Sequence, residues 1–244
     1  ALWPNNVDGN AYRDSYPHFM DKNGYTLVDG GKYQEPNEDW TAMISEFKKA
    51  GAEIFTGVMI PPDFANFWKQ ANQQGWKPKV FDMAKAILFP AAMQAVGEIG
   101  YNLSGPMYWH ATFPFTSPLS GMTCQQIADE WEKEKNDMWQ QPLLHYLLGD
   151  WVTDVLKRTK NIDDKEDIIA TIASTNLKET IGGALDFTAP IEWTSLHPVQ
   201  NVCVTPLYGG QWVKGTGKYM FDIKIVSNPN NDPVTIQQEL IPLN

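Results

Sequence analysis

The first 110 residues alternate between short apolar runs and segments with helical periodicity, and this alternation constrains the fold more than any other feature. The runs 52–58 and 79–83 are predicted strands, and a further strand is expected near 103–109. In the segments between them, apolar residues recur at i, i+3, i+4 and i+7, as they do from Phe64 to Ala71. Strands that alternate with helices over short links are typical of a parallel sheet with helices on its faces. The sequence therefore predicts an α/β fold.

Turn-forming and capping residues set the expected element ends. Gly24, Gly51 and Gly75 each follow a helical pattern, and Pro62 stands where a first helical turn tolerates proline. The predicted helices are 10–22, 39–51, 62–75 and 88–96, and 25–28 is a strand candidate. Right-handed crossovers would place the carboxyl ends of all the parallel strands on one edge of the sheet.

The pattern changes after the segment 109–118, and helices dominate from there. They are predicted at 122–135, around the apolar face from Leu144 to Val155, and at 165–174. Strand-like segments follow at 184–187, 202–208 and 211–213, and the tail from Asn228 is expected to be extended. The part beyond Ser117 thus has long helices but few strands for them to cover. We therefore predict that its sheet either lacks strands or is completed by other polypeptide.

The start of the sequence is unusual. Ala1-Leu2-Trp3 has the pattern of the last residues of a strand, and the turn 4–9 follows it. One interpretation is an edge strand that is simply short. The other is that the sequence begins partway through a longer protein.

Charge and composition exclude several classes of partner. The formal net charge is −10, and no run of Lys and Arg is longer than two. Binding to nucleic acid needs clustered positive charge, so nucleic acid is not an expected partner, and neither is an anionic membrane surface. No apolar stretch approaches the roughly 20 residues of a membrane span. Cys124 and Cys203 favour two separate thiols, although a disulfide is the alternative.

Catalytic and metal-binding patterns are absent from the sequence. There is no nucleophile elbow, phosphate-binding loop or zinc-binding helix motif, and the four histidines share no metal-ligand spacing. Aromatic residues are numerous, but at helical spacing they are more typical of core than of sugar stacking. We therefore predict no catalytic residue, no metal and no cofactor.

A ligand-binding site does not require a catalytic motif. In an open α/β sheet, ligands lie beyond the carboxyl ends of the strands. The residues at those ends supply apolar contact, a few polar groups and one cation, which suits a small-molecule cleft. Met59-Ile60-Pro61 would form a stiff apolar lip, although it could equally do no more than join a strand to a helix. The candidate ligand-binding residues, expected on one concave surface, are Asp8, Met59, Ile60, Lys85 and Trp109.

Several segments resemble a known family in the same order. They are Trp3-Pro4-Asn5-Asn6-Val7-Asp8-Gly9, Phe47-Lys48-Lys49-Ala50-Gly51-Ala52, Pro62-Asp63-Phe64-Ala65-Asn66-Phe67-Trp68, Leu156-Lys157-Arg158-Thr159 and Ile181-Gly182-Gly183-Ala184-Leu185. Together they are similar to type I periplasmic substrate-binding proteins of ABC importers, of the branched-chain amino-acid (leucine/isoleucine/valine) receptor type. The similarity extends to about Ile225, and it rests on the ordered set rather than on one motif.

The resemblance implies two lobes, each a parallel sheet flanked by helices, with the ligand bound between them. Residues 1–116 would form the second lobe, 117–199 the carboxyl-terminal part of the first lobe, and 200–244 a crossing strand and the return to the second lobe. The chain would then lack the amino-terminal part of its first lobe, and that part would be a partner. This would also account for the unusual start.

The resemblance further implies a non-catalytic, periplasmic or extracytoplasmic receptor that delivers a small organic solute to the permease of an ABC importer. The family's aromatic after the first strand of this lobe is replaced by Asp8. In that family, a carboxylate binds the ammonium group of an amino-acid ligand. The matching position in this chain is near Ala84-Lys85, where there is no acid. Lys85 instead favours an anionic solute, such as a carboxylate. Two alternatives remain open: a ligand-sensing regulator of the same fold, and a doubly wound enzyme whose catalytic residues lie outside this sequence.

Overall fold

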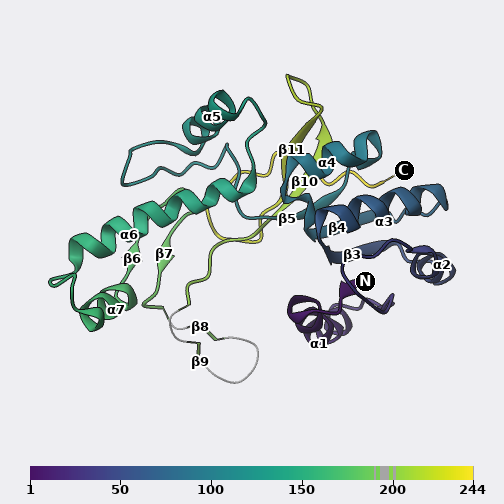
Figure 1. The fold of residues 1–244 in the computed structure, drawn as a ribbon, viewed down its shortest axis with the longest axis horizontal. Coiled ribbons are helices and arrows are strands. Elements are labelled where there is room, and N and C mark those ends of the chain that lie inside the picture. Colours follow the sequence, from purple (N-terminus) through teal and green to yellow (C-terminus); the bar gives the residue numbers. More distant parts are fainter. Residues whose placement is uncertain (190, 193–197, 200–201, 244) are drawn as a thin grey trace. The chain divides into compact units, whose positions relative to one another are not determined.

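The computed structural model describes residues 1–189, 191–192, 198–199 and 202–243. The chain forms two compact units. Residues 1–106, 209–228 and 235–244 make up the first, here called the sheet unit. Residues 107–208 and 229–234 make up the second, here called the helical unit. Figure 1 shows both, and the predicted boundary at residue 200 lies outside the described residues.

The sheet unit is built on a mainly parallel sheet. Its strands are β1 (Trp3–Pro4), β2 (Lys32–Tyr33), β3 (Ile54–Met59), β4 (Val80–Lys85), β5 (Ser104–Met107), β10 (Tyr208–Lys214) and β11 (Phe221–Ser227). Five of them run in the order β11-β10-β5-β4-β3. β3, β4 and β5 are parallel, and β10 and β11 form an antiparallel pair. β1 lies between β2 and β3, because it pairs with β2 and Leu2 bridges to Gly57.

The helices of the sheet unit confirm the predicted alternation. They are α1 (Val7–Lys22), α2 (Thr41–Lys49), α3 (Pro61–Gln73) and α4 (Pro90–Val96), with 3-10 turns at Ala86–Leu88 and Gly97–Gly100. The mixed α/β class with parallel strands is therefore as predicted. Among the described residues, every helix is too short or too polar to cross a bilayer.

Two local predictions in this unit were wrong. α1 begins at Val7 rather than at Asn10, because the Asn6 side chain caps it by accepting the backbone N–H of Gly9 at 2.9 Å. Gly9 also permits close packing of this helix on β1, since a Cβ there would lie 2.0 Å from the Pro4 carbonyl oxygen. The predicted strand at 25–28 is not a strand, and β2 forms at Lys32–Tyr33 instead.

An aromatic cluster fills the core between the sheet and helices α2 and α3. Phe55 of β3 is buried at its centre, 1% exposed. Its ring lies 4.8 Å from that of Phe81, 4.9 Å from that of Phe67 and 5.6 Å from that of Phe47, measured between centroids. Successive residues of β3 point to opposite faces of the sheet. On the face opposite Phe55, Val58 packs with Ala1, Trp3 and the tyrosines of α1. The two faces of the sheet are therefore covered by different helices.

The helical unit contains α5 (Cys124–Lys135), a 3-10 turn (Gln141–Tyr146), α6 (Leu147–Arg158) and α7 (Lys165–Ala173). Its strands form two antiparallel pairs, β6 (Asn176–Leu177) with β7 (Leu185–Asp186), and β8 (Ile191–Glu192) with β9 (Pro198–Val199). Within the described residues, each of these pairings is two residues long. Among the described residues of this unit, more lie in helices than in strands, in line with the expectation that helices dominate after the segment 109–118. The strand predicted at 202–208 was wrong, because β10 begins only at Tyr208.

The cysteines are not joined to each other. Cys124 is buried and Cys203 is half-buried, and both are free thiols. Burial raises the pKa of Cys124 to about 12, so this side chain stays protonated. The disulfide left open by the sequence does not form.

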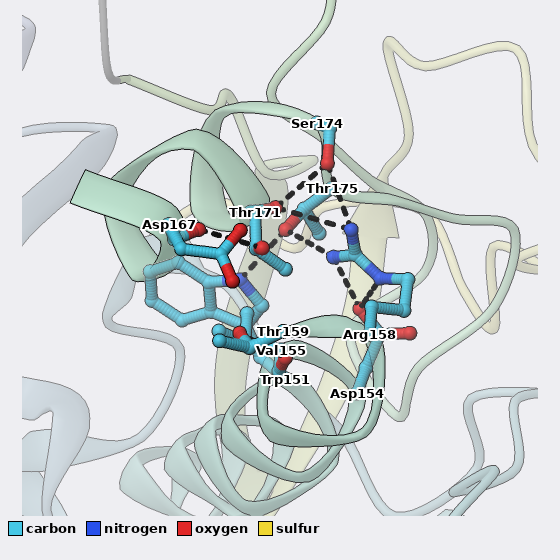
Figure 2. A network of polar contacts seen from close by, with 9 residues as sticks. All are labelled: Trp151, Asp154, Val155, Arg158, Thr159, Asp167, Thr171, Ser174 and Thr175. Atoms are coloured by element: carbon cyan, nitrogen blue, oxygen red, sulfur yellow. Dashed lines mark hydrogen bonds and ion pairs between the residues drawn. The ribbon is translucent and has the colours of Figure 1, made fainter. Parts of the chain in front are cut away.

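Arg158 ties together the elements at the end of α6 (Figure 2). Its Nε and Nη2 both donate to Asp154 Oδ2, at 2.8 and 2.6 Å. Nη1 donates to the backbone oxygen of Thr171 at 3.1 Å and to Ser174 Oγ at 2.8 Å, and Nη2 donates to Thr175 Oγ1 at 3.0 Å. One guanidinium group therefore satisfies acceptors on α6, on α7 and on the segment after α7.

We expect Arg158→Lys to lower the free energy of unfolding by about 1–2 kcal/mol, because an ammonium keeps the charge but cannot reproduce the planar fork. Urea unfolding of the two proteins measures the difference. Lys157→Arg, at the neighbouring exposed position, is the matched control. Equal stability of Arg158→Lys and the parent would contradict the prediction, because it would show that the hydrogen bonds of Arg158 add no net free energy of unfolding.

Candidate functional site

Three strand ends of the sheet unit lie at one edge. In the parallel pairing of β3 with β4, Met59 is opposite Lys85, so these strands end together. β1 lies beside β3 in the same direction, and the turn after it leads into α1 and Asp8. The topology thus brings Asp8, Ile60 and Lys85 to the carboxyl edge, as predicted for residues that follow strands of one parallel sheet.

Asp8 and Lys85 form an ion pair across this edge. Lys85 Nζ lies 2.9 Å from Asp8 Oδ2, although the residues are 77 positions apart in the sequence. The side chains are 45% and 56% exposed, so water screens the pair and it adds at most about 1 kcal/mol to stability. Lys85, which the sequence predicts to contact an anionic solute, thus has a carboxylate partner within the sheet unit. The pair places one charge of each sign at an accessible position.

The backbone of Lys85 is in a rare conformation. Its φ and ψ are 73° and −63°, a region that residues with a side chain seldom occupy. Such a residue costs about 1–3 kcal/mol and persists where the surrounding structure fixes it, which is common at ligand sites. The turn directs the chain from the end of β4 into the buried 3-10 turn Ala86–Leu88. The backbone of Lys85 is therefore held by a defined turn and not by a loose loop.

Met59 does not reach the surface of this edge. It is 0% exposed, because it points to the same side of β3 as Phe55, toward the core beneath α3. Ile60 is half-buried and precedes α3, whose first two residues are prolines. The stiff lip expected from Met59-Ile60-Pro61 is thus presented through Ile60 and Pro61.

Trp109 belongs to the helical unit and is also 0% exposed. Its ring lies edge-on to Trp139 with the centroids 5.5 Å apart, and Trp139 also packs on His110 at 4.9 Å. A side chain in such a cluster is core of its own unit. Its burial and that of Met59 leave Asp8, Ile60 and Lys85 as the predicted residues that are accessible.

Two carboxylates near the same edge were missed by sequence reasoning. Asp63, in the first turn of α3, is 2% exposed and accepts the backbone N–H of Asn37 at 3.1 Å. Burial raises the pKa of Asp63, and the negative charge of Glu35 raises it further. Glu35, two residues after β2, accepts a hydrogen bond from the Asn6 amide. An acid in the first turn after a Pro-Pro helix start was the available signal, although it is equally typical of helix capping.

A cavity of about 570 Å³ opens on the α1 side of the sheet unit, but not at the carboxyl edge. Its lining includes Glu53 and Ile54 at the start of β3, and Tyr16 and Phe19 of α1. Asp82 also lines it and accepts a hydrogen bond from Thr56 Oγ1 at 3.2 Å. Because ligands of open α/β sheets bind at the carboxyl ends of strands, this cavity is not the candidate ligand site.

Asp82 makes a testable contribution to the pH dependence of stability. Burial raises its pKa from the ordinary 3.8 to about 6, so between these values the folded chain binds more protons than the unfolded chain. The contribution of Asp82 to stability should therefore fall by about 2 kcal/mol as the pH rises from 4 to 7, and Asp82→Asn should remove that contribution. Unfolding measured at both pH values, with the exposed Asp129→Asn as control, gives the difference. Identical pH slopes for the two variants would contradict the assignment to Asp82.

Comparison with known proteins agrees with this fold. Residues 2–216 match the family model described as periplasmic binding protein, which is most of the chain. The chain belongs to the periplasmic binding protein family. A search of curated protein sequences finds no significant match.

Solved structures show that the fold is the type I periplasmic binding protein fold. A leucine-binding protein from Thermotoga maritima aligns with a TM-score of 0.71 at 13% identity, over 93% of this chain and 60% of that chain. A solute-binding protein of an ABC transporter from Rhodopseudomonas palustris, solved with 3,4-dihydroxybenzoic acid, aligns with a TM-score of 0.69 at 16% identity, over 95% of this chain and 60% of that chain.

A third structure is that of a protein named for several amino acids. It is the leucine-, isoleucine-, valine-, threonine- and alanine-binding protein from Brucella ovis, which aligns with a TM-score of 0.68 at 14% identity, over 100% of this chain and 56% of that chain. This periplasmic binding protein thus spans about 60% of the length of the first two structures. At these sequence identities the structural similarity establishes the fold and does not identify a solute.

Proposed function

We propose that this periplasmic binding protein is an extracytoplasmic receptor that captures a small organic solute and delivers it to the membrane permease of an ABC importer. The solute would lie in a cleft between two lobes, one of which contains the sheet unit. The observation that carries the proposal is the carboxyl edge of β1, β3 and β4, where Asp8, Ile60 and Lys85 lie at or just beyond the ends of the three strands.

The charges at this edge favour an amino acid or another carboxylate-bearing solute. The Lys85 ammonium is half-exposed, and its partner Asp8 is held by a single ion pair that water screens. A solute carboxylate could replace Asp8 at Lys85 and gain a charge-assisted hydrogen bond. Two of the structural relatives fit this chemistry, since one is a leucine-binding protein and the other was solved with 3,4-dihydroxybenzoic acid.

The proposal also assigns the segments of this chain to two lobes and implies one further part. We assign residues 1–116 to the second lobe, 117–199 to the carboxyl-terminal part of the first lobe, and 200–244 to a crossing strand and the return. An amino-terminal part of the first lobe would complete the receptor. The length of the relatives supports this, because the chain covers 60% of the leucine-binding protein.

A thermal-shift screen of the complete protein tests the function. The library should contain amino acids, aliphatic carboxylates, aromatic carboxylates, neutral sugars and amines. We expect a carboxylate-bearing solute to raise Tm, because a ligand that binds the folded state at 100 times its Kd stabilises it by about 2.7 kcal/mol. A shift with sugars or amines alone would contradict the role given to Lys85.

A further inference from the structure

Two carboxylates beside the carboxyl edge each have one oxygen that is shielded from solvent and has no hydrogen-bond donor among the described residues. Asp63, in the first turn of α3, is 2% exposed, and its Oδ1 accepts the backbone N–H of Asn37 at 3.1 Å. Glu35 is half-buried, and its Oε2 accepts the Asn6 amide at 2.5 Å. The oxygens without a donor are Asp63 Oδ2 and Glu35 Oε1. Burial of such an oxygen is costly, so a positively charged or proton-donating group is expected to pair with it.

The two carboxylates lie close to each other at one loop, residues 34–39. Glu35 belongs to this loop, and Asp63 is bonded to it through Asn37. Burial raises the pKa of Asp63, and the charge of Glu35 raises it further. Burial also raises the pKa of Tyr33, and the charges of Glu35 and Asp63 both add to this rise. The two negative charges therefore repel each other, and the Tyr33 phenol lies near both.

No basic side chain neutralises this pair within the part of the chain that the structure describes. The ion pairs found there involve neither Glu35 nor Asp63. The loop is also anchored on α3, because Asn66 Nδ2 and Gln70 Nε2 donate to the backbone oxygen of Glu38 at 3.0 and 2.8 Å. The uncompensated charge therefore lies where a bound cation would hold a loop to the start of a helix.

We propose that Asp63 Oδ2 and Glu35 Oε1 bind a divalent cation of the calcium class, which joins the loop 34–39 to the start of α3. Carboxylate and carbonyl oxygens select hard cations of this kind over transition metals. Sequence motifs predicted no metal, because these acids come from separate segments. The site uses none of Asp8, Ile60 and Lys85, so it goes beyond the proposed solute-binding function.

The site is expected to be weak. Among the described residues, no set of three or more His, Cys, Asp and Glu side chains is placed to hold a metal, so the site depends on two carboxylates. Calcium takes 6–8 oxygens, and backbone oxygens of the loop and water would supply the others. A Kd of about 0.1–1 mM is typical of extracellular calcium sites with few charged ligands.

Thermal unfolding of the complete protein, freed of metal by a chelator and measured without solute, tests the site. We expect about 10 mM CaCl2 to raise Tm by about 2–5 °C, because a ligand well above its Kd stabilises the folded state. Glu35→Gln and Asp63→Asn should lose this shift. Glu38→Gln, which removes the same charge from an exposed position of the loop, is the matched control and should keep it. Comparing each variant with and without Ca²⁺ separates loss of the site from loss of stability.

Two results would overturn the proposal. An equal Ca²⁺ shift in the parent, Glu35→Gln and Glu38→Gln would show general neutralisation of a chain whose formal net charge is −10. Absence of a Ca²⁺ shift in the parent would also overturn it. A gain in stability on acidification that Asp63→Asn removes would then assign a shared proton to the two carboxyls.

Terbium luminescence tests where the ion binds. Tyr33 lies near both carboxylates, and Trp40 packs on it with ring centroids 4.8 Å apart. Light absorbed by these rings should excite a bound Tb³⁺, and Ca²⁺ should displace the emission. We expect Glu35→Gln to lower the Ca²⁺-sensitive emission at least about 5-fold, and emission equal to that of the parent would contradict the site. Neither readout uses a solute, so the cation site can fail while the receptor function stands, and the reverse.

Discussion

Phe55→Ala should lower the free energy of unfolding by about 3–5 kcal/mol, the largest stability effect expected in the sheet unit. The ring is 1% exposed and packs against aromatic side chains from α2, α3 and β4, so its removal loses buried apolar area and leaves a cavity. Because α2 and α3 cover the same face of the sheet, neither helix can close that cavity without moving from its strand contacts. Urea unfolding, monitored by tryptophan fluorescence, measures the loss.

The matched control is Ile54→Ala, one residue earlier on the same strand. Its side chain is 48% exposed and points to the opposite face, so we expect a loss of no more than about 1 kcal/mol. Equal losses at the two positions would contradict the assignment of the buried face.

Lys85→Gln should weaken binding of a carboxylate-bearing solute by roughly 10-fold to 150-fold. Glutamine is uncharged and one atom shorter than lysine, so the substitution removes a charge-assisted hydrogen bond, which typically contributes about 1.5–3 kcal/mol. Lys79→Gln is the control, because Lys79 immediately precedes β4 and lies at its opposite end. Calorimetry on the complete protein with the solute from the screen measures both affinities.

Asp8→Asn gives a result of the opposite sign. Asp8 competes with a solute anion for Lys85 at 2.9 Å, so its neutralisation should strengthen binding a few-fold. Unchanged affinity in Lys85→Gln, with an intact fold, would assign Lys85 to the surface and make Asp8 the next candidate contact, for a cationic or neutral solute.

The regular elements were predictable because their signals are local. α3 combines prolines at its start, a repeated apolar face and Gly75, whose φ of 65° ends the helical segment. β3 and β4 were apolar runs between such helices. These features depend on residues a few positions apart, so periodicity finds them.

The errors came from features that depend on distant partners. The apolar segment 25–28 has strand composition, but it lies beside the start of β1, where Val28 accepts a single hydrogen bond from Ala1, and Leu27 packs against the Trp3 cluster. β2 is only two residues long and includes an exposed lysine, so composition gave no signal for it.

The sequence predicted where the candidate site lies, at the carboxyl edge of the sheet, but not which side chains are accessible there. Parallel topology correctly brought Asp8 and Lys85 together, whereas their ion pair depends on side-chain reach across 77 positions. Met59 ends β3 and Trp109 comes shortly after β5, but strand parity turns Met59 inward, and Trp109 packs on Trp139. Backbone position at a strand end therefore did not determine which side chains are accessible.

Titration calorimetry of the complete protein with the best solute from the screen, followed by recovery of that solute, tests the receptor function most directly. A receptor should bind one solute molecule per protein and return it chemically unchanged, with a negative heat-capacity change as apolar surface is buried. Conversion of the solute into a product during the titration would contradict the account, because it would show an enzyme. Absence of binding by any carboxylate-bearing solute would contradict the role proposed for the edge that Asp8, Ile60 and Lys85 share.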